Sequence, residues 1–376
     1  MNDPTGGTRA VIAMFALNGL LLGTWASRIP AIAEALTLSK AQLGLLLLCI
    51  GGGAIASFPF AGTLSDRHGA AALSRILGAV NAVGLVLAAL APNAWTLALA
   101  LIVFGAGHGG QDVAMNGWGA EVERRRGRPV MSFFHATWSL GAGIGAALGA
   151  GAVWLGVGVA AHFWAVGLVG AALALWAARA PWASPRSAEA GPVFALPAWS
   201  LVPVGFVAMT SSMGEGAVAD WSALFLIEVS GATEARAALG YALFSAVMVA
   251  MRLSGTRIIE ALGPVRAARG SALAAVAGIA LAVGLGGEAA VLAGFALMGV
   301  GYALIFPLAF SRAANDPFIP QGRAIAGVAT LGYGGLLLGP VVIGALAAGI
   351  GLRWAMGLLA VLALLSLWPA GRLRGA

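Results

Sequence analysis

Charge is the scarcest feature of this sequence. Only 9% of its 376 residues are charged, while 60% are hydrophobic. Soluble domains carry about 25% charged residues, so a chain this poor in charge cannot cover a surface that faces water. The ordinary soluble globular class is therefore excluded, and we expect an integral membrane protein. Cysteine is scarce as well: Cys49 has no second cysteine to pair with, which excludes an internal disulfide.

The apolar residues run in continuous blocks and show no strict alternation of apolar and polar positions. Alternation over segments of about ten residues is typical of a transmembrane β-barrel, whereas apolar blocks of about 20 residues match a helix that crosses a bilayer. We therefore predict an all-α membrane protein with twelve transmembrane helices. The expected spans are residues 10–30, 41–62, 73–91, 95–119, 130–153, 158–179, 199–226, 237–259, 268–286, 289–311, 324–349 and 353–371.

The basic residues indicate how the helices are oriented. With the N-terminus inside, every lysine and arginine falls on the inner side except Arg28, Lys40, Arg236 and Arg353. An excess of Lys and Arg in inner loops is usual in membrane proteins, so both termini are predicted to be cytoplasmic. The charge of +7 forms no basic stripe, which argues against a nucleic-acid partner. The Ala-, Gly- and Arg-rich composition favours a bacterial cytoplasmic (inner) membrane.

The two halves of the sequence resemble each other. A Pro- and Ser-rich gap at 180–198 is expected to be a cytoplasmic linker between one six-helix bundle at 1–179 and a second at 199–376. Parallel repeats of six spans are a known plan for transporters, which hold their solute between the halves near mid-membrane. The matched positions are Gly62 with Gly255, Arg75 with Arg269, Arg128 with Arg323, and Trp138 with Tyr333.

The loop after the second span carries a specific motif. It reads Gly62-Thr-Leu-Ser-Asp66-Arg67-His-Gly69, with Arg75 downstream. Together with the twelve spans and the repeat, it resembles the signature loop of the major facilitator superfamily. The resemblance implies two six-helix bundles around a central cavity and secondary active transport. It also implies a gating role for these five numbered residues at the inner side, where Asp66 would cap a helix end and pair with basic residues at 124–128.

Three further segments resemble the sugar:proton symporter branch of that superfamily, typified by fucose permease. They lie at residues 29–45, 112–116 and 214–221. The resemblance implies transport of a small polar solute, with sugars among the candidates, together with protons. That branch has an acid four residues before the proline of its first helix, and this chain has Ala26 there. We therefore place the chain in that branch or in a neighbouring group.

Acidic residues inside the spans are the strongest candidates for proton coupling. An acid at the centre of a spanning helix costs roughly 2.5–3.5 kcal/mol on insertion scales, so it is a functional-site hypothesis by default. Asp112 shares one helix face with His108 and Asn116, and Glu215 shares a face with Ser211. We predict Asp112 and Glu215 as the proton-coupling residues. The alternatives are that Asp112 only pairs with His108 or lies in water near the inner interface.

Polar and aromatic residues on the expected inner faces are candidates for solute binding. Aromatic rings stack on the apolar face of a sugar, and Asn and Gln side chains bond its hydroxyl groups. Arg28 could bind an anionic group, pair with Asp220 or Glu215, or anchor its helix at the interface. For any single aromatic residue, packing between helices is the alternative. The predicted substrate-binding residues are Asn18, Trp25, Arg28, Gln111, Asn116, His135, Trp138 and Tyr333.

Motifs of enzymes are missing from the sequence. It has no HExxH, no GxSxG and no phosphate-cradling loop, so we expect no enzyme, no metal site and no cofactor. The predicted function is secondary active transport of a small polar solute by alternating access and proton symport. Proton-antiport export of drugs or metabolites stays open, as does an intramembrane enzyme or a sensor without transport. The expected partners are the solute, protons and the lipid bilayer, and we expect a monomer.

Overall fold

The computed structural model describes residues 3–127, 130–184, 198–319 and 321–374, and no strand occurs in these ranges. The apolar blocks form helices because a helix satisfies its backbone N–H and C=O groups within one segment, which lipid cannot do. Within the helices, some side chains lie outside the description. They are those of Pro59, Asp66, Ser132, Ala314, Gln321, Gly322, Arg323, Ile325 and Ala326.

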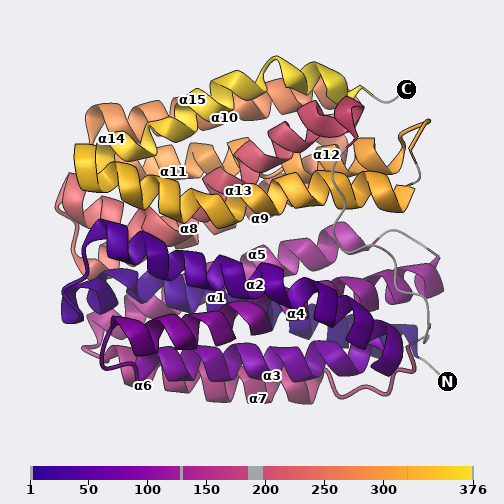
Figure 1. Cartoon of the computed structure of the whole chain (residues 1–376), viewed down its shortest axis with the longest axis horizontal. Helices are drawn as coiled ribbons and strands as arrows, with labels where there is room; N and C mark the ends of the chain where they lie inside the picture. Colours follow the sequence, from indigo (N-terminus) through magenta and orange to yellow (C-terminus); the bar gives the residue numbers. More distant parts are fainter. Residues whose placement is uncertain (1–2, 128–129, 185–197, 320, 375–376) are drawn as a thin grey trace. The chain divides into compact units, whose positions relative to one another are not determined.

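The first six apolar blocks form long helices that are labelled in Figure 1. They are α1 (Pro4–Ala35), α2 (Lys40–His68), α3 (Ala70–Ala89), α4 (Ala94–Arg126), α5 (Met131–Trp154), and a sixth made of α6 (Val159–Trp164), a π-helical stretch η1 (Ala165–Gly170) and α7 (Ala171–Ala177).

The later blocks repeat this plan after a short 3-10 turn η2 (Trp199–Leu201). They are α8 (Val202–Ser230), α9 (Glu234–Leu262), α10 (Pro264–Leu285), α11 (Glu288–Tyr302), α12 (Ile305–Ala314), α13 (Gln321–Ile350), α14 (Leu352–Met356), α15 (Leu358–Ser366) and the 3-10 turn η3 (Pro369–Leu373).

The number of spans agrees with the sequence except at the last one. In the described part of the chain, 11 helices are long and apolar enough to cross a membrane, and the apolar segment Leu352–Ser366 is shorter. The span predicted at 353–371 is divided at Gly357, whose N–H donates to the carbonyl of Trp354 at 3.0 Å. Such an i→i+3 bond tightens the turn and interrupts the α-helical pattern. The predicted twelfth span is therefore built from two short helices, α14 and α15.

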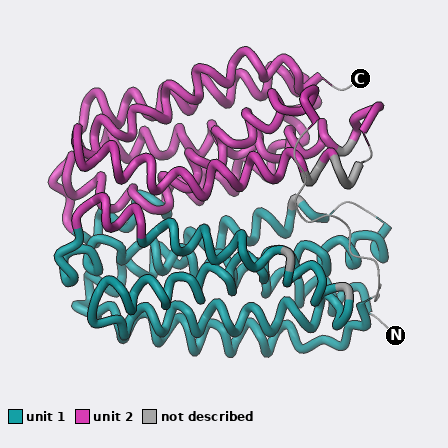
Figure 2. The backbone as a smooth tube through the Cα atoms, in the orientation of Figure 1, with its two compact units in different colours: residues 1–38, 46–190, 234–242 teal, residues 39–45, 191–233, 243–376 magenta. Residues whose placement is uncertain are grey.

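The helices gather in two compact units, coloured separately in Figure 2. The first unit comprises Met1–Leu38, Leu46–Ala190 and Glu234–Ala242, and the second comprises Ser39–Leu45, Gly191–Thr233 and Leu243–Ala376. The first unit thus includes the first turns of α9, and the second includes the first turn of α2. The domain boundaries at 179 and 199 stay a prediction.

The same helix pairs recur in both units. In the first unit α1 packs along α5 and α3 along α4, and in the second α8 packs along α13 and α10 along α11. These pairs occupy equivalent places in the two halves of the sequence. The predicted pseudo-repeat of two helical bundles is therefore confirmed.

Glycine allows the closest of these approaches, between α1 and α5. A Cβ atom on Gly23 would collide with the backbone carbonyl of Ala142, and one on Gly145 would collide with the carbonyl of Leu20. Thin side chains of this kind let transmembrane helices pack backbone to backbone. The α1–α5 contact therefore depends on these positions having no side chain.

We expect Gly23→Ala to destabilise the first unit although alanine is the better helix former. Overpacking of a tight contact costs roughly 1–3 kcal/mol, because the new methyl group meets rigid backbone. The melting temperature of the purified protein in detergent measures the effect. Gly151→Ala is the matched control, since Gly151 lies on α5 with nothing within 4 Å of its Cβ position, and an equal loss in both variants would contradict the prediction.

Candidate functional site

A cluster of buried amide side chains joins α1, α3 and α4 in the first unit. Gln111 is its centre: its Oε1 accepts from Asn18 Nδ2 at 3.0 Å and from Asn81 Nδ2 at 3.1 Å, and its Nε2 donates to the carbonyl of Met14 at 3.1 Å. Asn18, Asn81 and Gln111 have no exposed surface. Buried polar groups are usually hydrogen-bonded, and here the side-chain donors of Asn18, Asn81 and Gln111 each have an acceptor within the described part of the chain.

Trp138 extends this cluster to α5. Its indole Nε1 donates to Asn18 Oδ1 at 2.8 Å, and Asn18 Nδ2 also donates to the carbonyl of His108 at 3.1 Å. We call Asn18, Asn81, Gln111 and Trp138 the amide cluster. The structure thus brings together three of the predicted substrate-binding residues, of which only Trp138 is partly exposed.

Asn81 is the member of the amide cluster that sequence reasoning missed. It lies inside the predicted third span, and a single amide in an apolar helix was the signal that could have found it. Its partner on α4 could not be foreseen from that signal, because the two side chains are 30 residues apart.

We expect Gln111→Leu to destabilise the first unit. The amide donors of Asn18 and Asn81 would lose a shared acceptor, and each buried unsatisfied group costs about 1–3 kcal/mol. Thermal unfolding monitored by tryptophan fluorescence measures the loss. Met115→Leu, a volume-conserving change at another fully buried position of α4, should cost less than about 1.5 kcal/mol; equal effects would count against the prediction.

Asp112 directly follows Gln111 on α4 and is partly exposed. The side chain of Asn116 donates to the Asp112 carboxylate Oδ1 at 3.1 Å and to the Asp112 carbonyl at 2.8 Å. The predicted i, i+4 neighbourhood of these two residues is therefore present. His108 packs 6.3 Å from the ring of Phe104, and its Nδ1 has no hydrogen-bond partner in the described part of the chain.

Glu215 forms an ion pair inside the second unit. Its carboxylate Oε2 lies 3.3 Å from Arg252 Nη2, and the side chains of Arg252 and Glu215 are 12% and 20% exposed. Both residues lie within long apolar helices, α8 and α9, away from the helix ends. An arginine inside a span is tolerated when a carboxylate compensates its charge. The Arg252 charge is thus compensated by Glu215, and the assignment of Arg252 to the inner membrane side stays a prediction.

Arg28 has a partner that the sequence did not indicate. Its Nε lies 3.3 Å from Glu234 Oε1, and its Nη1 donates to the carbonyl of Val157 at 3.1 Å. The side chain is only 5% exposed, so the compensating charge matters. The pairing considered with Asp220 or Glu215 is corrected to Glu234, the first residue of α9. The spacing of charges along the chain carries no information about which helix end lies close to Arg28.

The remaining predicted binding residues are aromatic or imidazole groups at separate places. Trp25 is buried, with the rings of Phe104 and Phe163 each 6.3 Å away. His135 is exposed on α5, with its ring 5.2 Å from that of Phe15. Tyr333, on α13 of the second unit, is half-buried and lies 6.1 Å from Phe306.

The signature loop is helical up to His68 and turns at Gly69. Gly62 lies within α2, Arg67 is exposed, and Gly69 has a φ of 92°, a left-handed value that favours glycine. The side chain of Asp66 and residue Arg128 lie outside the described part, so the pairing of Asp66 with basic residues at 124–128 stays a prediction. Arg75 bonds the backbone carbonyls of Ala178 and Ala180, each at 2.8 Å.

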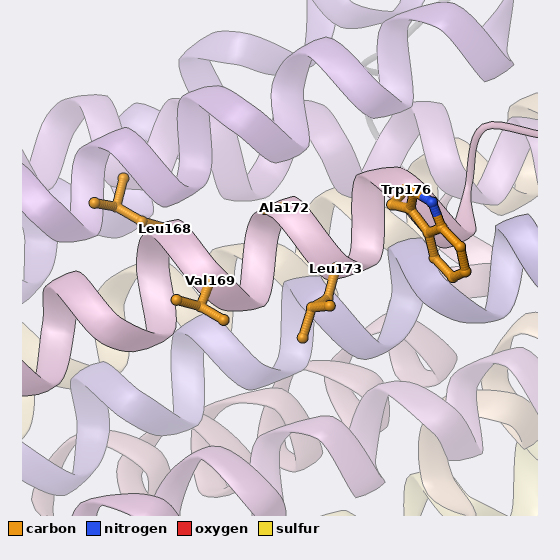
Figure 3. A pocket seen from close by; sticks show the side chains of 5 residues that line it. All are labelled: Leu168, Val169, Ala172, Leu173 and Trp176. Carbon is orange, nitrogen blue, oxygen red and sulfur yellow. The ribbon is translucent and has the colours of Figure 1, made fainter.

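An open groove on the surface of the sixth helical segment is distinct from all of these residues. Figure 3 shows its lining: Leu168, Val169, Ala172, Leu173 and Trp176. Leu168, Val169, Leu173 and Trp176 are exposed apolar side chains, as expected of a face toward lipid. In the described part of the chain, no three His, Cys, Asp or Glu side chains come together as metal ligands do.

Comparison with known families decides the class of the protein. Residues 11–317 match the model of the Major Facilitator Superfamily. The chain belongs to the major facilitator superfamily. Membership in the superfamily makes it a multi-pass membrane transporter.

Curated relatives of this superfamily member are named as transporters or membrane proteins. It is 48% identical over 346 residues to an uncharacterised transporter, y4wD, of Sinorhizobium fredii, with 90% of each chain covered. It is 35% identical over 350 residues to an MFS-type transporter of Yersinia pestis, with 93% of this chain and 91% of the relative covered. It is 33% identical to the membrane protein MosC of Rhizobium meliloti, over 92% of this chain and 85% of that protein.

Solved structures show the same fold. The nucleoside transporter NupG aligns with a TM-score of 0.73 at 14% identity, over 98% of this chain and 98% of that chain. A bacterial homologue of the human lysosomal transporter Spinster, inward-facing and unoccupied, aligns with a TM-score of 0.73 at 16% identity, over 98% and 97% of the two chains. At such low identity the likeness concerns this superfamily member's fold alone.

Proposed function

We propose that the protein is a secondary active transporter that moves a small polar solute together with protons across the bacterial cytoplasmic membrane. It would work by alternating access, as a monomer with both termini in the cytoplasm. The observation that carries the proposal is a pair of carboxylates inside spanning helices, each with a polar partner: Asp112 with Asn116, and Glu215 with Arg252.

Asp112 is suited to carry a proton because a neutral side chain holds its carboxyl group in place. The amide of Asn116 donates to Oδ1, and an amide can bond a carboxyl group in either protonation state. Around Asp112, α4 is mostly apolar. Taking up a proton on one side and releasing it on the other is then the role that fits this position.

Glu215 would be linked to the solute through Arg252. While the two side chains are 3.3 Å apart, their charges cancel. Protonation of Glu215 leaves the Arg252 charge without this compensation inside the span, which is costly. An oxygen atom of the solute that accepts a hydrogen bond from Arg252 would lower this cost, because it solvates the guanidinium. Proton uptake at Glu215 is thereby favoured when a solute with acceptor oxygens is present.

A hydroxyl-rich solute fits the remaining groups. Trp138 and Tyr333 are partly exposed aromatic rings at repeat-related positions, and aromatic faces suit the apolar side of a sugar ring. A sugar is thus among the candidate solutes. Nucleosides join them, because NupG is a nucleoside transporter with this fold and a nucleoside contains a sugar.

Two linked measurements test the proposal. Purified protein is screened by thermal shift against pentoses, hexoses and nucleosides, and the compound with the largest stabilisation is tested in liposomes with an imposed pH gradient. Accumulation driven by an inward proton gradient is the expected result. Solute movement against the direction of proton flow would favour the antiport alternative. Absence of any flux for every stabilising compound would contradict transport and favour a sensor.

A further inference from the structure

The chain directly after α7 is bound to the first unit. Residues 178–184, which we call the strap, run from the end of the predicted first bundle into the predicted linker. Arg75 Nε donates to the carbonyl of Ala178 and Arg75 Nη2 to that of Ala180, both at 2.8 Å. The guanidinium also lies 4.6 Å above the ring of Trp118 on α4. The guanidinium of Arg75, the arginine downstream of the signature loop, is therefore bound to the strap.

Trp182 is the side chain that anchors the strap. Its indole Nε1 donates to Glu121 Oε2 at 2.6 Å. Its ring lies 6.5 Å from that of Trp118, and the Arg125 guanidinium lies 5.1 Å above it. On α1, a Cβ atom at Gly7 would overlap the Trp182 ring. The indole thus touches α1 and α4 at once, and its one donor has a carboxyl oxygen of Glu121 as its acceptor.

Ser184, the last residue of the strap, binds the start of α3. Its Oγ accepts from the backbone N–H of Ala71 at 3.1 Å. That N–H belongs to the first turn of a helix, where it has no partner within the helix. A Cβ on Gly69 would lie 2.9 Å from that of Ser184, so Gly69 is required both for its left-handed backbone and for the passage of the strap.

We propose that residues 178–184 are a fixed part of the first unit, with Arg75, Glu121 and Trp182 as positioning residues that join the ends of α1, α3 and α4 into one body. The strap stays bound throughout the transport cycle. A loosely attached connector would make only nonspecific apolar contacts with the helices. Here two backbone carbonyls, an indole N–H and a serine hydroxyl each meet a specific partner on α3 or α4.

Limited trypsin digestion of the full-length protein in detergent tests the docking. Cleavage after Arg179 requires the strap to leave its contacts. We expect Trp182→Ala and Glu121→Ala to raise its rate by roughly tenfold or more, as local opening becomes easier. Glu121→Gln keeps an acceptor oxygen for the indole and should return the rate to near that of the wild type. Mass spectrometry identifies the cut. Equal rates in wild type and Trp182→Ala would overturn the proposal.

A disulfide tests whether the strap remains bound during transport. Gly6→Cys and Ala180→Cys are combined with Cys49→Ser, which removes the one native cysteine. A Cβ on Gly6 would lie 3.3 Å from that of Ala180, close to the roughly 3.5–4.5 Å of disulfides. Loss of maleimide labelling on oxidation reports the bond, and the two single-cysteine variants are controls. We expect the bond to form readily, and failure to form would overturn the proposal.

Proton entry into liposomes, read by a trapped pH dye after addition of a defined mixture of pentoses, hexoses and nucleosides, then compares the oxidised and reduced protein. Rates within about twofold support the proposal. A loss of roughly tenfold that a reductant reverses would overturn it. If wild-type protein gives no proton entry, the proposed symport fails for these solutes, and the trypsin and labelling results alone decide about the strap.

Discussion

Replacing Arg252 with methionine is expected to lower the free energy of unfolding by about 3 kcal/mol, the lower end of the cost of breaking a buried ion pair. The substitution would leave the Glu215 carboxylate without the cation that lies 3.3 Å from it, between two helices that offer little water. Thermal unfolding in detergent and the yield of monodisperse protein measure the effect. We expect the lower end of the range for buried ion pairs because the side chains of Arg252 and Glu215 keep some exposure to solvent.

Two comparisons separate loss of the ion pair from loss of an arginine as such. Arg257→Met removes an exposed arginine from the same helix and should change stability by less than about 0.5 kcal/mol. The double variant Glu215→Gln with Arg252→Met removes both charges and should regain most of the lost stability. If the double variant is as unstable as Arg252→Met alone, the compensation of charge is not what holds these residues together.

Asp112→Asn should reduce solute accumulation driven by a pH gradient by roughly tenfold or more, because an amide cannot carry a proton. Counterflow exchange of the same solute, which needs no net proton movement, should be largely kept. The shape of the side chain is unchanged, and a hydrogen bond with Asn116 can still form. Uptake into liposomes at a series of external pH values measures the first effect, and exchange at equal pH measures the second.

Glu260→Gln serves as the control for that measurement, since Glu260 is an exposed carboxylate on α9. Its pH profile should match that of the wild type. An unchanged pH dependence in Asp112→Asn would remove Asp112 from proton coupling. Loss of both driven uptake and exchange would instead assign Asp112 to solute binding.

Local neighbours in the site were predictable from the sequence because helix geometry is regular. Asp112 and Asn116 are four residues apart, and residues at that spacing lie on the same face. Their hydrogen bond in the structure follows from this period alone. The same reasoning proposed His108 as a third member, yet the orientation of an imidazole ring depends on neighbours such as Phe104, which the spacing does not specify.

Partners on different helices were not predictable in the same way. Glu215 and Arg252 are 37 residues apart, and their meeting depends on how α8 and α9 are rotated about their axes. Counting charges considers sequence position alone, so it could not indicate that Arg252 pairs with Glu215. Arg28 shows the same limit, since Glu234 is one of several acids that composition would have allowed.

The strap is the clearest case in which a compositional rule misled. Proline and serine marked the region after α7 as a linker, and such composition is typical of segments without packed contacts. Trp182 lies among those residues and forms a hydrogen bond with Glu121. A tryptophan inside a Pro-rich gap was the signal that could have indicated docking.

The sequence by itself determined the class of the protein: a helical membrane chain with repeated halves, the signature loop and two acids within its spans. These follow from hydrophobic length, charge distribution and local spacing, which are properties of the chain in order. Only the tertiary structure decided that Arg252 compensates Glu215, that Glu234 compensates Arg28, and that Arg75 and Glu121 bind the strap. Such pairings arise from the rotation and close approach of whole helices, and no single segment encodes them.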